Sequence, residues 1–270
     1  MNPNQALWEK GDFTRIASSM RRSGDALIER IGVTPGSDVL DLGCGDGTTA
    51  VPAARRGAEV LGVDIARNLV EAGTLRAKEE GLNNLRFQCG DASSLDEVGD
   101  DRFDLVVSVF GAMFAPRPLD VAKEMVRVTK PGGRIVMGNW IPGDPTLVAQ
   151  ILRISSAYSP PPPEGFISPM TWGVVDDVVE RFVGAGLDAG TVDCKPDTFV
   201  FEADVPPTEY LSWFRDFYGP TMNAFEAAAQ SGRAEALFGE LDELFNAQNT
   251  STEPAKTAIP ATFLRVTATV

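Results

Sequence analysis

The sequence predicts an α/β fold built on a doubly wound, mostly parallel sheet. Short apolar runs alternate with longer stretches of helical periodicity between residues 38 and 139. Expected strands cover residues 38–42, 59–63, 85–89, 103–109 and 133–138, and expected helices cover 47–56, 67–80 and 118–129. Strands that alternate with helices in this way form a parallel sheet covered on both faces.

A glycine-rich turn follows the first expected strand. The segment DLGCGDG occupies residues 41–47, and a helical pattern resumes at Ala50. A side chain at Gly43 or Gly45 would hold a ligand away from the backbone, and glycine also accepts the backbone angles of a tight turn. We interpret Cys44 as a small residue that fills this turn rather than as a catalytic thiol. Strand, glycine turn and helix form the unit that binds mononucleotides in many sheets.

An acidic residue closes the second expected strand. Asp64 follows the apolar run 59–63 and lies about 20 residues after Gly43, where an acid accepts hydrogen bonds from ribose hydroxyls. The dinucleotide fingerprint requires a further glycine at the sixth position of the turn. This chain has Thr48 there, which disfavours a nicotinamide dinucleotide.

Four motifs together resemble the class I S-adenosylmethionine (SAM)-dependent methyltransferases. They are DLGCGDG at residues 41–47, Asp64, GDA at 90–92 and KPGG at 130–133, and the resemblance extends over residues 34–140. It is closest to the small-molecule branch, similar to the enzymes of ubiquinone and menaquinone biosynthesis. The resemblance implies a Rossmann-like sheet of seven strands with an antiparallel final strand, SAM as the cofactor, and methyl transfer to a small molecule.

The resemblance also implies roles for single residues. Asp41 is expected near the ammonium of the methionine part of SAM, Asp91 at the adenine amino group, and the amide of Ala92 against the adenine ring. Asp91 has an alternative role, because Asp is a favoured N-cap for the helix that would follow. The other expected cofactor contacts are Gly43, Cys44, Gly45, Asp64, Ile65, Val109 and Phe13.

The loop after the fourth expected strand lies where the methyl group would meet its acceptor. Phe110, Met113 and Phe114 are apolar, whereas enzymes that methylate nucleic-acid bases or protein amides carry a polar N/D-P-P-Y type motif there. An apolar wall suits an aromatic or aliphatic acceptor. The alternative is that these side chains belong to the core.

The remaining segments predict a helical cap on one methyltransferase domain, residues 1–270. The cap would come from residues 1–30, 140–175 and 207–247. Tyr210, Trp213 and Tyr218 follow one another at helical spacing, and with Trp140 we expect them in the acceptor pocket. The alternative is that the stripe only packs on the sheet. Tyr158, Tyr210 and Tyr218 are candidates for proton transfer, and no residue is assigned as a general base.

Composition limits the function classes. The 270 residues carry a formal net charge of −14 and no histidine. An acidic chain disfavours nucleic acid as a partner, and the commonest general base and metal ligand is missing. The cysteines have no metal-binding spacing, so we expect no metal site, and we expect a cytoplasmic protein with reduced thiols. No apolar run is long enough to span a membrane, and nothing indicates an oligomeric state.

Two other classes of function stay open. A nicotinamide-dependent oxidoreductase would also use a glycine turn on a parallel sheet, although Thr48 and Asp91 speak against it. A SAM-fold protein that does not transfer methyl groups, either a ligand sensor or an enzyme assisted by SAM, would carry the same cofactor motifs.

Overall fold

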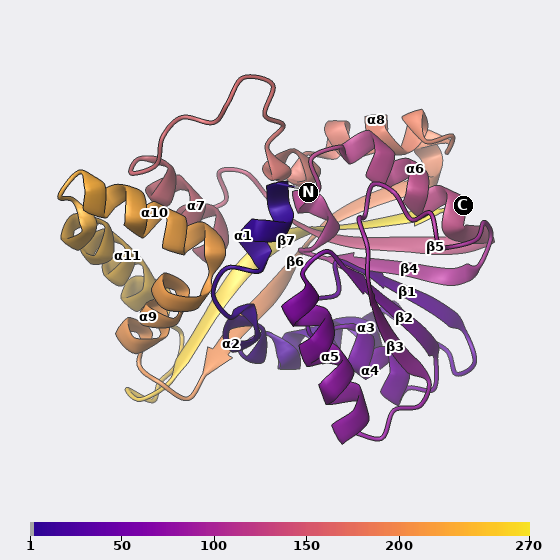
Figure 1. The fold of residues 1–270 in the computed structure, drawn as a ribbon, viewed down its shortest axis with the longest axis horizontal. Coiled ribbons are helices and arrows are strands. Elements are labelled where there is room, and N and C mark those ends of the chain that lie inside the picture. Colours follow the sequence, from indigo (N-terminus) through magenta and orange to yellow (C-terminus); the bar gives the residue numbers. More distant parts are fainter. Residues whose placement is uncertain (1–2) are drawn as a thin grey trace.

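One seven-stranded sheet organises the computed structural model, which describes residues 3–270 (Figure 1). The strand order is β3-β2-β1-β4-β5-β7-β6, in which β7 runs antiparallel to β5 and β6 and the other neighbours are parallel. This confirms the predicted fold class. The strands are β1 (Asp38–Leu42), β2 (Glu59–Asp64), β3 (Leu85–Cys89), β4 (Phe103–Val109), β5 (Thr129–Trp140), β6 (Val192–Ala203) and β7 (Thr257–Thr269).

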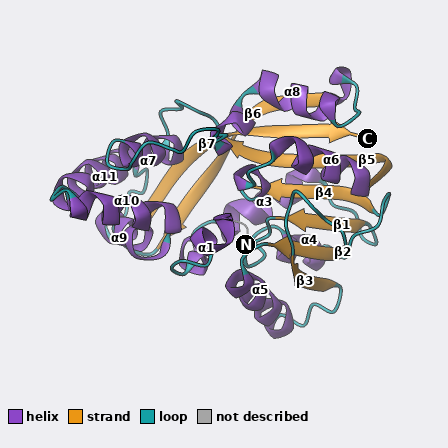
Figure 2. Cartoon of the chain, turned by 45° about the horizontal axis from the view of Figure 1, so that its top comes forward, coloured by secondary structure: helices purple, strands orange, loops and turns teal. Residues whose placement is uncertain are grey.

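Helices cover both faces of the sheet (Figure 2). Helices α3 (Arg21–Ile31), α4 (Ala50–Arg55) and α5 (Arg67–Glu79) lie on one face, and α6 (Pro118–Val128) and α8 (Val175–Gly184) lie on the other. Burial on both faces explains the continuous apolar runs of the central strands. Leu40 and Val106, from β1 and β4, are fully buried.

A group of helices gathers around the long ends of β6 and β7, beyond the other strands (Figure 1). The group comprises α7 (Leu147–Ser156), α9 (Pro207–Phe217), α10 (Gly219–Gln230) and α11 (Ala234–Gln248). Helix α11 packs against α7, α9 and α10. We expected two helices within residues 207–247, but the chain breaks at Gly219-Pro220 and forms three, because Pro starts a helix readily and interrupts one already formed.

The N-terminal segment forms two short helices, α1 (Pro3–Trp8) and α2 (Phe13–Ser18), at the carboxyl ends of the strands (Figures 1 and 2). Ion pairs and hydrogen bonds hold it there. Lys10 pairs with Glu226 of α10 at 2.8 Å, and the Glu9 carboxylate accepts a hydrogen bond from the Arg67 amide at the start of α5. The segment is thus fixed between the sheet and the outer helices.

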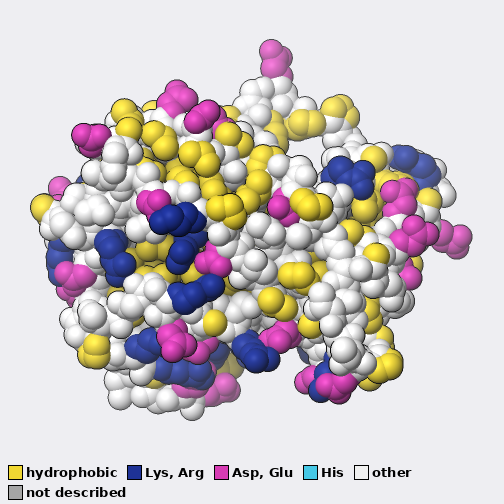
Figure 3. Space-filling view, turned by 180° about the vertical axis from the view of Figure 1, so that it is seen from behind, with side chains coloured by type: hydrophobic (Ala, Val, Ile, Leu, Met, Phe, Trp, Pro, Cys, Tyr) yellow, Lys and Arg dark blue, Asp and Glu magenta, His cyan; other side chains and the backbone are white. Residues whose placement is uncertain are grey.

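Surface charge is mixed rather than separated by sign. Figure 3 shows Lys and Arg side chains interspersed with Asp and Glu on the face opposite that of Figure 1, beside apolar side chains. Arg22 pairs with Glu202, and Arg30 pairs with Asp197, both at 3.0 Å. In residues 3–270, no helix combines the length and apolar character needed to cross a bilayer.

Candidate functional site

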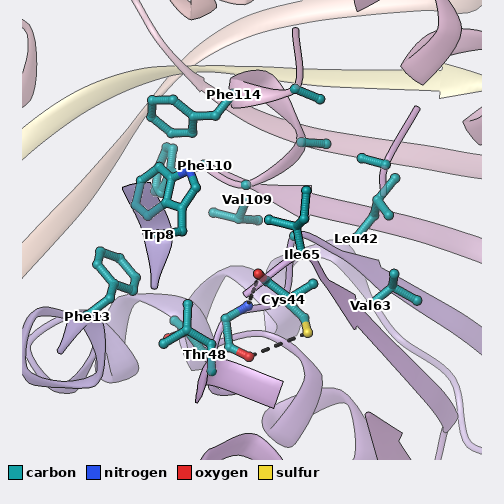
Figure 4. Close-up of a pocket in the computed structure, with 18 of the residues that line it drawn as sticks. Trp8, Phe13, Leu42, Cys44, Thr48, Val63, Ile65, Val109, Phe110 and Phe114 are labelled. Carbon is teal, nitrogen blue, oxygen red and sulfur yellow. Dashed lines mark hydrogen bonds between the residues drawn. The ribbon is translucent and has the colours of Figure 1, made fainter. Parts of the chain in front are cut away.

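A cleft lies at the carboxyl ends of β1 to β4 (Figure 4), and its empty space, open solvent included, is about 930 Å³. This is the edge at which doubly wound sheets bind ligands. Its walls come from the glycine turn, the ends of β2, β3 and β4, and the N-terminal helices. The lining consists of Asn4, Trp8, Phe13, Met20, Leu42, Gly43, Cys44, Gly45, Asp46, Thr48, Thr49, Val63, Asp64, Ile65, Leu69, Gly90, Asp91, Ala92, Val109, Phe110, Gly111, Ala112, Phe114 and Ala115.

The glycine turn shapes the floor of the cleft. The backbone of Gly43 lies so close to Gly111 that a Cβ atom on Gly43 would be 2.6 Å from the Gly111 Cα. Gly45 has a φ of +54°, and no described atom beyond its two neighbours in the chain lies within 4 Å of the position that its Cβ would take. Gly43 is therefore required by packing between the β1 and β4 loops, whereas Gly45 leaves open space where a ligand can approach the backbone.

Asp64, at the end of β2, ties the turn to the next helix. Its Oδ2 accepts a hydrogen bond from the Gly45 amide at 2.8 Å, and its Oδ1 accepts one from the Ala66 amide at 2.9 Å. Burial raises the pKa of the Asp64 carboxyl above its usual range, while these two bonds oppose the rise. The side chain lines the cleft and keeps lone pairs for a further donor.

Asp41 is buried and lies outside the cleft lining. Its Oδ2 accepts a hydrogen bond from the Thr49 hydroxyl at 2.5 Å, and its Oδ1 has no well-formed partner among the described residues. Burial raises the pKa of Asp41 to about 7, and the nearby Asp64 carboxylate adds to the rise. A buried oxygen without a partner is costly, and a donor or a positive charge supplied by a ligand would offset that cost.

Asp91 and Ala92 follow β3 and line the cleft. The Asp91 Oδ1 accepts hydrogen bonds from the Ser93 amide at 2.9 Å and the Ser93 hydroxyl at 2.6 Å. These bonds close a turn, and residues 90–102 form no helix, so the expected alternative of an N-cap at Asp91 is wrong. Ser93 thus fixes the orientation of the Asp91 carboxylate at the cleft.

Two arginines support the outer side of the glycine turn. The Arg21 guanidinium of α3 lies 2.9 Å from the Asp46 carboxylate, whose side chain is only 3% exposed. Arg76 of α5 donates to the carbonyl of Gly47 at 3.2 Å. Local sequence patterns carry no signal for these contacts, because Arg21 and Arg76 come from separate helices. We did not predict either residue.

Four rings form one side of the cleft, and we call Trp8, Phe13, Phe110 and Phe114 the aromatic wall (Figure 4). Trp8 meets Phe114 edge to face at a centroid distance of 4.9 Å, and it meets Phe13 edge to face at 5.7 Å. Asn4 donates a hydrogen bond to the carbonyl of Phe114. The N-terminal helices thus supply half of a wall whose other half follows β4.

Phe110 stands at the end of β4 with a φ of +57°, which is rare for a residue with a side chain. Its ring stacks on Trp140 at 3.6 Å with an angle of 9° between the planes. Trp140 is only 3% exposed and does not line the cleft. The structure therefore corrects our expectation for Trp140, whose ring supports Phe110 from behind.

The cleft lining also excludes four other residues that we expected in the acceptor pocket: Met113, Tyr210, Trp213 and Tyr218. Met113 is 1% exposed. The Tyr210 hydroxyl lies 2.6 Å from the Ser19 hydroxyl inside the protein, and burial raises its pKa. Tyr218 contacts Trp8 and Phe13 with centroid distances of 6.0 Å. The stripe on α9 therefore packs against the body of the protein, as in the alternative interpretation.

Cys44 and Tyr158 are the remaining candidates for a nucleophile or a proton carrier. Cys44 lines the cleft, but burial and the nearby carboxylates raise the pKa of its thiol well above the usual range, which agrees with a filling role. Tyr158 lies outside the lining and donates a hydrogen bond to Glu240 at 2.6 Å. Neither residue is an available base at the cleft.

Comparison with known proteins connects this site with methyl transfer. Residues 40–137 match the family model described as a methyltransferase domain. An uncharacterized protein of Mycobacterium tuberculosis is 32% identical over 89% of this chain and 86% of its own length. A demethylmenaquinone methyltransferase of Renibacterium salmoninarum is 34% identical over 48% of this chain and 54% of its own. The YcgJ protein of a Bacillus species shares the fold, with a TM-score of 0.58 and 21% identity over 92% of this chain and 97% of its own.

Proposed function

Because the chain belongs to the class I SAM-dependent methyltransferases, we propose that it methylates a small, apolar or aromatic organic acceptor. The observation that carries this proposal is the cleft itself, in which the glycine turn faces an aromatic wall (Figure 4). Such a wall offers apolar contact area and few polar partners, which suits a small organic molecule. The acidic net charge and the mixed surface charge support a small molecule over a nucleic acid.

The residues at the glycine turn fit SAM. We propose that the open backbone at Gly45 receives the methionine part and that the Asp64 lone pairs accept the ribose hydroxyls. We propose that the adenine lies against Asp91 and Ala92, because both line the cleft at the end of β3. Asp41 lies outside the lining, so it would act on the ammonium through its charge rather than by a direct contact.

SAM supplies an electrophilic methyl group, so the protein mainly contributes proximity and alignment. We propose that Val109 contacts the cofactor and that Phe110 holds the acceptor at the end of β4, because both line the cleft next to the glycine turn. The apolar wall excludes water from the reacting atoms, which disfavours hydrolysis and other competing reactions. A general base is not required for this reaction, and none is assigned.

We propose further that residues 1–270 act as one domain with a cap, and the cap segments support the cleft in two ways. The N-terminal segment supplies Asn4, Trp8, Phe13 and Met20 to the lining. The segments 140–175 and 207–247 contribute no lining residue in the described chain, but Trp140 and Tyr218 pack behind the wall. The outer helices therefore position the wall instead of contacting the acceptor.

Transfer from SAM labelled in its methyl group tests the proposal. The protein is incubated with labelled SAM and a fractionated cell extract, and label is counted in the small-molecule, protein and nucleic-acid fractions. We expect label in the small-molecule fraction. Label confined to protein or nucleic acid would contradict the acceptor class, and calorimetric binding of S-adenosylhomocysteine (SAH) without any transfer would favour a non-methylating member of the fold.

A further inference from the structure

We infer that the acceptor atom is the nitrogen of a neutral amine, which becomes a cation as it takes the methyl group. This inference rests on the proposed function and narrows its acceptor class. Three features carry it: the charges in the cleft lining, the arrangement of the aromatic wall, and the direction in which charge moves during transfer.

The cleft lining contains no positive side chain among the described residues. Its ionisable side chains are the carboxyls of Asp46, Asp64 and Asp91 and the buried Cys44 thiol. Arg21 lies outside the lining, and its guanidinium is already paired with Asp46 at 2.9 Å. A phenolate, carboxylate or phosphate would therefore find no positive side chain in the described lining. Its only counter-charge would be the SAM sulfonium, which is neutralised by the transfer, and a buried anion is costly without hydrogen-bonding partners.

Neighbouring rings of the aromatic wall lie at steep angles to one another. The planes of Trp8 and Phe13 meet at 85°, and those of Trp8 and Phe114 meet at 65°. All three rings are half-buried and line the cleft, so part of each ring is open to it. The face of an aromatic ring attracts a cation through its quadrupole, and sites that recognise quaternary ammonium groups combine several such rings.

Charge moves toward this wall when an amine is methylated. The nitrogen lone pair forms the new bond to the methyl carbon, and the bond from that carbon to sulfur breaks with its electron pair kept by sulfur. Sulfur becomes a neutral thioether and nitrogen becomes a cation, which loses a proton to water if it carries one. Aromatic rings stabilise the positive charge that develops on nitrogen, so they favour the transition state over the bound neutral amine. An anionic acceptor would instead lose its charge during transfer and gain nothing from the rings.

Binding of matched probes tests the inference without turnover. Choline and 3,3-dimethylbutan-1-ol have the same shape but differ in charge, because a carbon replaces the nitrogen. Each is titrated calorimetrically into the SAH-saturated protein. We expect choline to bind about tenfold more tightly, the scale of a cation–π contact with desolvated rings. Equal binding, tighter binding of the alcohol, or no binding of either probe would overturn the inference.

Substitutions in the aromatic wall test whether its rings cause the preference for choline. Trp8→Leu and Phe114→Leu should each reduce the preference for choline to about twofold or less, a loss larger than any change in SAH affinity, and Trp8→Phe should restore part of the preference. Phe166→Leu is the control, because Phe166 is 55% exposed and lies outside the lining. Unchanged preference in both leucine variants, or weaker SAH binding in place of lost preference, would overturn the inference. Label transferred only to phenols or acids would also overturn it, and the proposed function would stand.

Discussion

Replacement of Asp64 by Ala tests the link between the glycine turn and cofactor binding. The carboxylate holds the amides of Gly45 and Ala66 at 2.8 and 2.9 Å, and we propose that it also accepts the ribose hydroxyls. A hydrogen bond to a charged group contributes about 1.5–3 kcal/mol. We therefore expect Asp64→Ala to weaken SAM and SAH binding by roughly 1–3 kcal/mol, which is about 5- to 150-fold in Kd.

The same substitution separates binding from stability. Ala66 is fully buried, so its orphaned amide should cost about 1–3 kcal/mol of unfolding free energy. Asp64→Asn should fall between the wild type and Asp64→Ala, because the amide keeps one acceptor but turns a donor toward a backbone N–H. Asp193→Ala, at an exposed ion pair on β6, is the matched control. SAH affinity is measured by calorimetry, and unchanged affinity in a folded Asp64→Ala protein would refute the role of Asp64.

Three further predictions concern the turn and its supports. Gly111→Ala should lower the unfolding free energy by about 2 kcal/mol or more, because the new Cβ would lie 2.3 Å from the Gly43 carbonyl; a thermal melt equal to that of the wild type contradicts this packing. Arg21→Met should weaken SAH binding and lower stability by about 1–3 kcal/mol, since it leaves the buried Asp46 carboxylate unpaired, and calorimetry that shows no change in either would refute it. The pKa of Asp41, raised to about 7 in the folded protein, means that the folded state binds more protons than the unfolded state between about pH 4 and 7. The contribution of Asp41 to stability should therefore be present at low pH and be lost as pH rises through 7, and denaturant titrations should show that Asp41→Asn removes this component.

The central sheet was predictable from the sequence because its signal is local. The strands β1 to β4 are short apolar runs bounded by turns, and the glycine turn and Asp64 mark the ends of β1 and β2. The expected bounds of these strands match those of the structure to within one residue. Helix α1 was missed because six residues hold too little periodicity to signal a helix. The break at Gly219 was missed because the aromatic stripe that begins at Tyr210 continues to Tyr218 at helical spacing.

The set of residues that line the cleft was harder to predict than the fold. The floor of the cleft was predictable, because the glycine turn and the acids at the strand ends occupy fixed places along the chain. The acceptor side was not, because an aromatic residue on a strand or helix carries no sign of which neighbour its ring will face. Trp140 and Phe110 are both large and apolar, yet their stacking places only Phe110 against the cleft. Contacts between distant segments, such as Arg21 with Asp46, left no pattern to find.

The position of the transferable methyl group tests the account most directly. SAM carrying a ¹³C-labelled methyl group is bound to the protein without acceptor, and the methyl resonance and its nuclear Overhauser effects are recorded. Methyl contacts with ring protons that disappear in Trp8→Leu or Phe114→Leu, together with an upfield shift from the nearby rings, are the predicted result. A bound methyl group at its solution frequency, without a contact to any aromatic proton, would contradict the arrangement of glycine turn, cofactor and aromatic wall proposed for this cleft.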